Sequence, residues 1–149
     1  GLGDVYKRQV FEHRVKNRKT PLVRGFDDVF YAPHSRHTTV PTEAIESEEQ
    51  LIILAESEEA GVFLTMSLDG KQIFVMGHPE YDRVTLNNEY MRDKNKGLEI
   101  ALPKNYYPDD NFENRPLLTW RSHANNLYTN WVNYYVYQVT PYDLYGTPF

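Results

Sequence analysis

The stretch Ile73-Phe74-Val75-Met76-Gly77-His78-Pro79-Glu80 joins an apolar run to a histidine and a glutamate two residues apart. Side chains at positions i and i+2 of an extended segment point the same way, so Glu80 can hold one imidazole nitrogen of His78 while the other nitrogen faces a substrate. Such a pair supplies two of the three members of a catalytic triad and predicts a general base. Taken alone, a His-Pro-Glu sequence after an apolar run is more typical of a strand-ending turn, because proline cannot continue the ladder.

The third member of the triad is missing from the sequence. The chain has no cysteine in 149 residues, so the thiol that usually accompanies a His-Glu pair has to come from outside it. The lack of cysteine excludes disulfides and thiolate metal sites, and it is typical of a cytoplasmic protein. His34 and His37 are spaced as metal ligands can be, but no carboxylate pair accompanies them, so we expect no metal site. The sequence therefore predicts part of an enzyme.

The composition excludes several classes of function. With 40% hydrophobic and 25% charged residues, the chain is expected to form one globular domain or a large piece of one. Its net charge of −5 provides no basic surface for nucleic acid or for an anionic membrane. No apolar run approaches the roughly 20 residues that span a bilayer, so we expect no membrane association.

Short apolar runs bounded by turn residues predict five strands. These runs are residues 10–15, 27–33, 51–55, 62–68 and 72–76. Asp69-Gly70, between the last two, is typical of a hairpin turn. Apolar residues spaced by three and four predict helices at 81–96, ended by Gly97, and at 122–140, and Thr42 is expected to cap a single helical turn. Strands followed by helices predict an α/β architecture with a sheet that is open because its beginning is missing.

Three regions follow from this pattern. Residues 1–9 have neither helical nor strand periodicity, and we expect a foreign or disordered junction there. Residues 10–144 are expected to form the C-terminal part of one α/β domain, and residues 145–149 a tail.

Five motifs carry a resemblance to a known family. They are Arg24-Gly25-Phe26-Asp27-Asp28, Ala32-Pro33-His34-Ser35-Arg36, Gly77-His78-Pro79-Glu80-Tyr81-Asp82, Trp120-Arg121-Ser122-His123, and the stretch from Asn130 to Leu144. Together the motifs resemble the homoserine O-acyltransferases of methionine biosynthesis, a family that includes homoserine O-succinyltransferase. The resemblance covers about residues 10–144, as the C-terminal half of a family member. It implies a class I glutamine amidotransferase-like (flavodoxin-like) sheet with flanking helices, whose N-terminal half is missing here.

The resemblance also implies a reaction. In the family a cysteine takes the acyl group from acyl-CoA, and the side-chain hydroxyl of L-homoserine then attacks the acyl-enzyme. By motif, His78 would be the general base, Glu80 its orienting carboxylate, Arg92 the partner of the homoserine carboxylate, and Ser35 a substrate contact. Acetyl-CoA is expected as the donor rather than succinyl-CoA, because it is the commoner donor in the family. Acyl-CoA is a co-substrate, no cofactor is expected, and a homodimer is compatible with the sequence.

Other interpretations of the same residues stay open. Without its neighbours, Arg92 would be a solvated helix residue and Ser35 a loop cap. The family also has a substrate-contacting lysine before the Val-Phe-Glu-His stretch, but Tyr6 stands at that position and Lys7 is one residue out of register. Two alternatives to an acyltransferase are the glutaminase half of a class I amidotransferase and a non-catalytic module that binds an amino acid.

Overall fold

The computed structural model describes residues 7–36 and 40–137 of the chain. These residues form strands, two longer α-helices, one short α-helix, and short 3-10 and π segments. In chain order they are β1 (Lys7–Val15), η1 (Pro21–Val23), β2 (Val29–Arg36), α1 (Thr42–Glu46), β3 (Leu51–Ser57), β4 (Gly61–Ser67), β5 (Ile73–Val75), α2 (Thr85–Asn95), η2 (Pro108–Asp110), α3 (Arg121–Trp131) and η3 (Val132–Val136).

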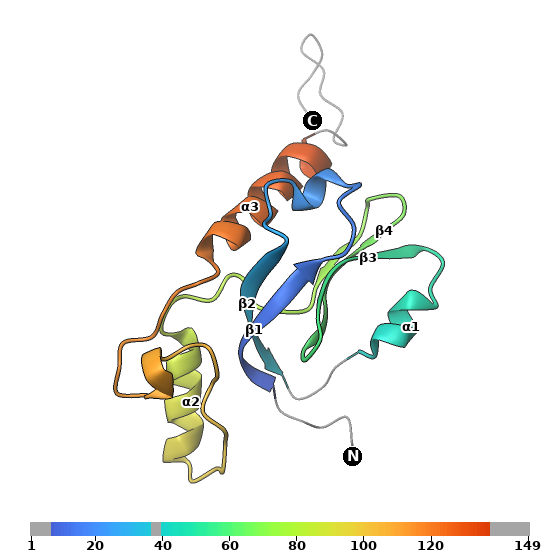
Figure 1. Cartoon of the computed structure of the whole chain (residues 1–149). Coiled ribbons are helices and arrows are strands. Elements are labelled where there is room, and N and C mark those ends of the chain that lie inside the picture. The colour runs from blue at the N-terminus through green and yellow to red at the C-terminus, as the bar shows by residue number, and fades with distance from the viewer. Residues whose placement is uncertain (1–6, 37–39, 138–149) are drawn as a thin grey trace, which may run out of the picture.

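The five strands form one sheet in the order β2-β1-β3-β4-β5 (Figure 1). Every pairing in it is antiparallel. The mixture of sheet and helices confirms the α/β class, whereas the parallel pairing of a flavodoxin-like sheet does not occur among the described strands. The reason is connection length: β3, β4 and β5 follow one another through turns of a few residues, and a parallel neighbour needs a crossover of a dozen or more.

The Asp69-Gly70 turn is confirmed between β4 and β5. Gly70 has a φ of 73°, in the left-handed region that glycine adopts without strain. The Ser67 amide donates to the Gln72 carbonyl at 2.9 Å, which closes the hairpin. This turn fixes the register of β5 and, with it, the place where the His78 segment begins.

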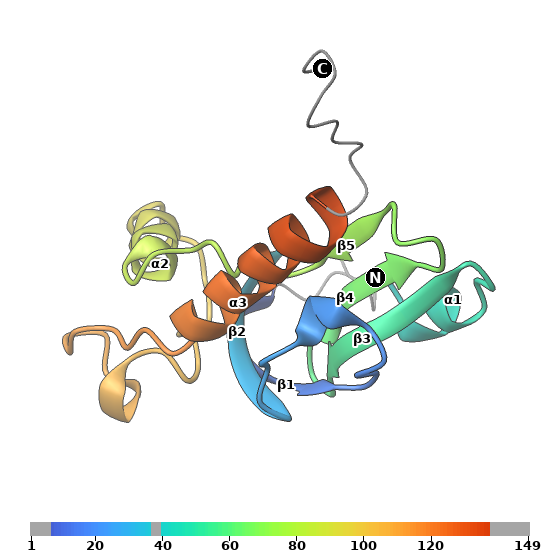
Figure 2. The ribbon, with the colours of Figure 1, turned by 90° about the horizontal axis from the view of Figure 1, so that it is seen from above.

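Helix α3 packs over one face of the curled sheet (Figure 2). The main hydrophobic core lies between them. It consists of buried side chains from η1, the loop that follows it, β2, β3, β4 and α3, namely Leu22, Val23, Phe26, Phe30, Ala32, Leu54, Ala55, Phe63, Leu64, Met66 and Leu127. Burial of these apolar side chains is the main force that holds α3 against the strands.

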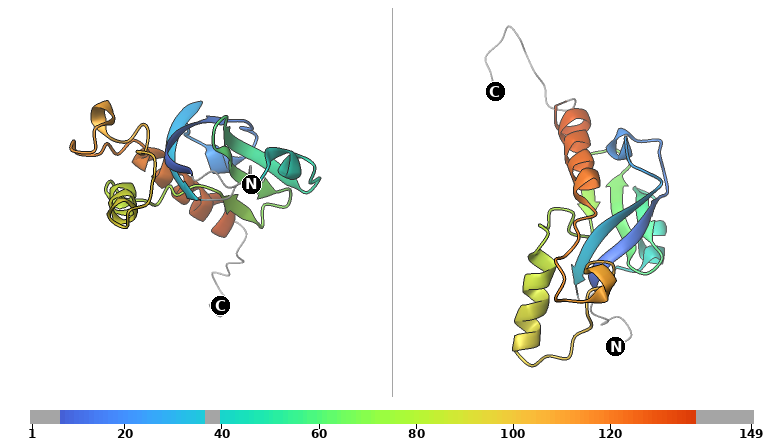
Figure 3. Two further views of the ribbon diagram at one scale, coloured as in Figure 1. Left: turned by 90° about the horizontal axis from the view of Figure 1, so that it is seen from below. Right: turned by 60° about the vertical axis from the view of Figure 1, so that its left-hand side comes forward.

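The chain between β5 and α3, which carries α2 and η2, lies beside the sheet (Figure 3). Helix α2 is braced there by the loop that follows it, because the buried Tyr106 hydroxyl donates to the Arg83 carbonyl and the Tyr107 hydroxyl to Asn87 Oδ1 at 2.6 Å. Trp120 is fully buried in one hydrophobic cluster with Tyr106 and Tyr107, and it donates from Nε1 to the Tyr81 carbonyl at 2.8 Å. These contacts fix α2 relative to the segment that carries His78.

Several element ends differ from the sequence-based expectation. β1 begins at Lys7 rather than at residue 10, and Gln9 pairs with His34 of β2. Pro41, and not Thr42, is the N-cap residue of α1, so Thr42 is the first helical residue. Helix α2 begins at Thr85, after a turn that follows Pro79, and Gly97 ends it as predicted, with a φ of 79°. The second predicted helix changes to π geometry after Trp131, and its last predicted residues, 138–140, lie outside the described part.

A polar network is buried between β1, β2 and β4. His13 and His34 are fully buried, and their Nε2 atoms are 2.8 Å apart. Arg36 donates from Nη1 to His34 Nδ1 at 2.7 Å and to the Met76 carbonyl at 2.6 Å, and from Nη2 to the Ala60 carbonyl. Arg36 therefore connects the histidine pair to the residues that lead into His78.

Candidate active site

His78 lies just beyond the end of β5, in a segment held against β2. Its backbone amide donates to the Pro33 carbonyl at 2.8 Å. The preceding residue, Gly77, is buried, and a Cβ atom there would come within 2.9 Å of the Phe63 ring and 3.0 Å of the Pro33 carbonyl oxygen. Only glycine allows this close approach, so Gly77 sets the path on which His78 leaves the sheet.

His78 and Glu80 form the pair that the sequence predicts. Nδ1 of His78 is 2.9 Å from Oε1 of Glu80. Because an ionised carboxylate only accepts hydrogen bonds, Nδ1 carries the proton in this pair and Nε2 keeps a free lone pair in the neutral ring. The His78 side chain is 36% exposed, so Nε2 can be reached by a reactant. The geometry is that of an oriented general base.

Glu89 of α2 links His78 to Ser35. Ser35 Oγ donates to Glu89 Oε2 at 2.7 Å, and the Tyr81 hydroxyl donates to Oε1 at 2.8 Å. Tyr81 in turn stacks on the His78 ring, with centroids 4.4 Å apart and planes at 12°. The structure thus connects two predicted site residues: Ser35 contacts the Glu89 carboxylate directly, and His78 is linked to it through Tyr81. Arg8 of β1 also lies near this carboxylate, with Nε 3.5 Å from Oε2.

Sequence reasoning missed Glu89 and Tyr81. Glu89 resembles any other charge on a polar helix, and its contact with Ser35 spans 54 residues of sequence. One available signal was its spacing from Arg92, because residues three apart lie on the same helix face. Tyr81 stands directly after the His-Pro-Glu motif, where an aromatic ring can fold back on the imidazole.

Arg92 lies on the outer part of the same helix face. Its Nε donates to Asp93 Oδ1 at 3.0 Å, and its side chain is 56% exposed. Arg92, together with Arg8, lowers the pKa of Asp93 to about 2, since both guanidinium groups stabilise the ionised carboxylate. Arg92 stands three residues after Glu89, about one helical turn along α2. Its guanidinium pairs with Asp93 and not with the His78–Glu80 pair. Tyr6, which stands at the family's lysine position, lies outside the described residues.

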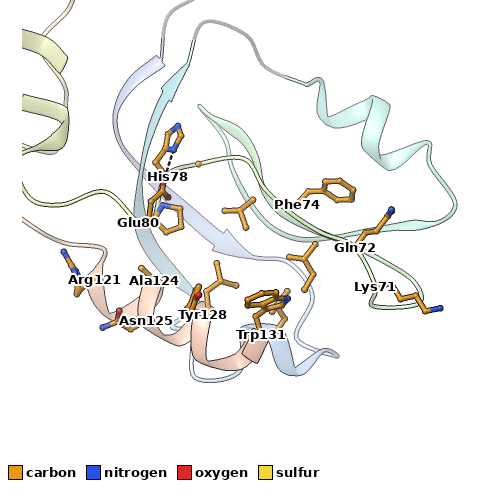
Figure 4. A pocket seen from close by; sticks show the side chains of 16 residues that line it. Lys71, Gln72, Phe74, His78, Glu80, Arg121, Ala124, Asn125, Tyr128 and Trp131 are labelled. Carbon is orange, nitrogen blue, oxygen red and sulfur yellow. Dashed lines mark hydrogen bonds and ion pairs between the residues drawn. The ribbon is translucent and has the colours of Figure 1, made fainter. Parts of the chain in front are cut away.

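A groove of about 1010 Å³ runs from His78 and Glu80 along α3 (Figure 4). One wall is the β4–β5 turn, β5 and the His78 segment, and the other is α3 with Leu22. The lining residues are Leu22, Lys71, Gln72, Ile73, Phe74, Val75, Gly77, His78, Pro79, Glu80, Arg121, Ala124, Asn125, Leu127, Tyr128 and Trp131. Most of this lining is apolar, and Phe74, Val75 and Trp131 are about 40% exposed. The groove places the His78–Glu80 pair at the end of an open apolar surface.

The described residues hold neither a cluster of metal ligands nor a helix able to cross a membrane. Residues 7–36 and 40–137 contain no group of three or more His, Asp or Glu side chains that could hold a metal ion. His34 is committed to His13 and Arg36, and His37 lies outside the described part. Among the described helices, none combines the length and the apolar composition needed to cross a bilayer.

Relatives of known name match nearly all of the chain. Homoserine O-acetyltransferases from Lachnoclostridium phytofermentans, Agathobacter rectalis and Lachnospira eligens are 71%, 69% and 64% identical to it, over 135, 134 and 135 residues. The matches cover 90–91% of this chain and 43–45% of the relatives, so the chain spans a little under half of their length.

One solved structure and one family profile also match the chain. The crystal structure of SMU.1228c is similar in fold, with a TM-score of 0.55 at 12% identity, over 86% of this chain and 52% of that one. At this identity the similarity concerns the fold alone. The profile of the family described as "HTS: Homoserine O-succinyltransferase" matches residues 7–142. Because the profile spans almost the whole sequence, the chain belongs to the homoserine O-succinyltransferase family.

Proposed function

We propose that the chain is the C-terminal part of a cytoplasmic homoserine O-acyltransferase. The enzyme would transfer an acyl group, acetyl rather than succinyl, from acyl-CoA to L-homoserine in methionine biosynthesis. The observation that carries this proposal is the 2.9 Å contact between His78 Nδ1 and Glu80 Oε1, beside an open groove in a chain of this family. The donor assignment is supported by the names of the relatives, which are O-acetyltransferases. No cofactor or metal takes part in the proposed reaction.

The nucleophile in this proposal is a cysteine from outside the chain. His78 takes the proton of the cysteine thiol, and the thiolate attacks the thioester carbonyl carbon of acyl-CoA. The carbon–sulfur bond to CoA breaks, and the imidazolium gives its proton to the leaving CoA thiolate. His78 Nε2 then removes the hydroxyl proton of homoserine as the hydroxyl oxygen attacks the thioester carbonyl carbon. The carbon–sulfur bond breaks, and the proton on the imidazolium returns to the leaving thiolate. Glu80 stabilises the imidazolium that forms between these two steps.

In this proposal the remainder of the domain packs on the groove. Among the described strands, β5 pairs with β4 alone, and its apolar residues Phe74 and Val75 are exposed beside the groove. A continuous apolar run is typical of a strand buried on both faces of a larger sheet, and an open apolar edge is a surface that proteins normally cover. We propose that a strand from the part of the protein outside this chain pairs with β5, which would complete a class I glutamine amidotransferase-like sheet and bring the cysteine to His78.

Glu89 and Arg92 suit the two charged groups of an α-amino acid. Residues three apart on a helix have Cβ atoms about 5–6 Å apart, which allows one carboxylate and one guanidinium to reach the same small ligand. In this proposal Arg92 turns from Asp93 to bind the homoserine carboxylate, for which its planar fork is well suited. Glu89 accepts hydrogen bonds from the ammonium group of homoserine. Ser35 orients Glu89 through its 2.7 Å hydrogen bond to Oε2.

The test of the function uses a chimaera that supplies the missing part. The segment of the Lachnoclostridium phytofermentans relative that precedes its counterpart of Lys7 is joined to residues 7–149 of this chain, so that β1 and Arg8 are kept. We expect the chimaera to transfer acetyl from acetyl-CoA to homoserine, and the chain alone to show no transfer because it contains no cysteine. Turnover by the chain alone would contradict the ping-pong mechanism. Glutamine hydrolysis by the chimaera without acyl transfer would support the glutaminase alternative instead.

Replacing Arg92 with alanine in this chimaera should raise the KM for homoserine about 10-fold, since the substrate carboxylate loses a charge-assisted partner worth roughly 1.5–3 kcal/mol. Arg92→Lys should recover little, because an ammonium cannot form the two parallel bonds. Steady-state kinetics at varied homoserine concentration measure the effect.

The control for Arg92 is Lys96→Ala, which removes an exposed cation just after the same helix. It should leave the KM for homoserine unchanged. The burst of CoA release in a single turnover without homoserine should be the same in both variants. A lost burst with an unchanged KM would place Arg92 on the acyl-CoA side.

A further inference from the structure

The aromatic ring of Tyr81 stacks on the imidazole ring of His78. Its ring lies nearly parallel to the imidazole, with centroids 4.4 Å apart and an interplanar angle of 12°. The hydrogen bond from His78 Nδ1 to Glu80 fixes one point of the imidazole, but the Glu80 side chain is 66% exposed. The stacked Tyr81 ring also fixes the plane of the imidazole, because the two rings pack face to face.

Three hydrogen bonds hold Tyr81 itself in place. Its amide donates to the His78 carbonyl at 3.1 Å, and its carbonyl accepts from the buried Trp120 Nε1 at 2.8 Å. Its hydroxyl donates to Glu89 Oε1 at 2.8 Å. Burial, with Glu89 as a second cause, raises the pKa of the Tyr81 hydroxyl, so the hydroxyl keeps its proton and remains a donor. The Tyr81 side chain is thus held in place, with its ring against the imidazole and its hydroxyl on the Glu89 carboxylate.

We propose that Tyr81 is a positioning residue that couples the amino-acid subsite to the general base. Its ring sets the plane of His78, and its hydroxyl sets the position of Glu89. This inference rests on the proposed function, because it takes His78 as the base and Glu89 as the partner of the substrate ammonium. It follows that the Tyr81 ring acts on kcat, whereas its hydroxyl acts on the KM for homoserine.

Two substitutions separate the ring from the hydroxyl. Tyr81→Phe keeps the stacked ring and removes the donor to Glu89. It should raise the KM for homoserine about 5-fold, the equivalent of one ordinary hydrogen bond, with kcat within about twofold of the parent. Tyr81→Leu removes the ring as well and should lower kcat about 10-fold at saturating homoserine, because the imidazole is no longer aligned. Both are measured in the chimaera.

The matched control is Tyr137→Phe, which removes the hydroxyl of a tyrosine that is 69% exposed at the end of η3. It should change neither constant. A purely structural role of Tyr81 predicts that Phe and Leu lower the melting temperature without splitting kcat from KM. Equal KM values for the parent and Tyr81→Phe would overturn the proposal, as would a parental kcat in Tyr81→Leu.

A second measurement covers the case in which Tyr81→Leu does not fold. In the folded parent and in Tyr81→Phe, the ring current of the stacked aromatic ring should shift the Hε1 resonance of His78 upfield, and His78→Gln identifies that resonance by its loss. An unshifted resonance in the parent would overturn the stacking part. If His78→Ala keeps near-parental turnover, the assignment of His78 as the base in the proposed function fails. An inactive His78→Ala with unchanged Tyr81 variants refutes only the present inference.

Discussion

Replacing His78 with alanine in the chimaera should lower the rate of acyl transfer to homoserine at least about 10²-fold, the usual contribution of a general base. Nε2 is the imidazole atom that is free to accept the hydroxyl proton, because Nδ1 is held by Glu80 at 2.9 Å. Without it the hydroxyl has to attack while still protonated. Initial rates with acetyl-CoA and saturating homoserine measure the loss.

The rate of a Glu80 variant tests whether Glu80 only supports the base or is as essential as His78. Glu80→Gln should cost less than His78→Ala, since an amide oxygen still accepts from Nδ1 but no longer stabilises the imidazolium. Glu58→Gln, at an exposed carboxylate between β3 and β4, is the matched control and should have no effect. Near-parental turnover of His78→Ala would remove His78 from the mechanism.

The local parts of the site were predictable from sequence. The contact between His78 and Glu80 depends on two residues of extended chain, and it is present as expected. Their catalytic role stays a prediction. The hairpin at Gly70 and the stop at Gly97 are likewise confirmed, because each is a property of one residue with a positive φ. Such features need no knowledge of the remainder of the chain.

The parts that depend on distant contacts were not predictable. Ser35 and Glu89 are far apart in sequence, and only the packing of α2 beside β2 brings the hydroxyl to the carboxylate. The sheet order has the same character, since β1 lies between β2 and β3 although β2 follows it directly in the chain. Short apolar runs indicate strands without indicating their partners. For Arg92 the motif predicted a role in binding, and the structure pairs its guanidinium with Asp93.

Acidification should destabilise the folded chain through His13. Burial lowers the pKa of His13 from 6.5 to about 4, with Arg36 as a smaller cause, while the carbonyls of Phe11 and Phe30 partly oppose the shift. Arg36 can only donate to His34 Nδ1, so His34 carries its proton on Nε2 and donates to His13 Nε2 at 2.8 Å. A proton on that atom of His13 would break this bond inside the core.

The direction of the pH effect follows from the two protonation states. Below pH 6.5 the unfolded chain takes up the proton first, so the stability contributed by His13 is complete above about pH 6.5 and is lost as the pH falls toward 4. Its full size is about 3 kcal/mol at roughly 1.4 kcal/mol per pKa unit. Urea unfolding followed by circular dichroism between pH 7 and 4.5 measures most of this loss, in a range above the unfolded pKa of Asp93, 3.8.

His13→Gln keeps an acceptor for His34 and removes the titration, so its free energy of unfolding should depend much less on pH over the same range. Glu58→Gln should retain the parental slope, since its side chain is exposed and lies outside the network. If His13→Gln does not fold, NMR of the parent still decides, because the His13 ring resonances should not titrate above about pH 5. A His13 resonance that titrates near 6.5, or a parental stability that is flat down to pH 4.5, would contradict a buried neutral histidine pair.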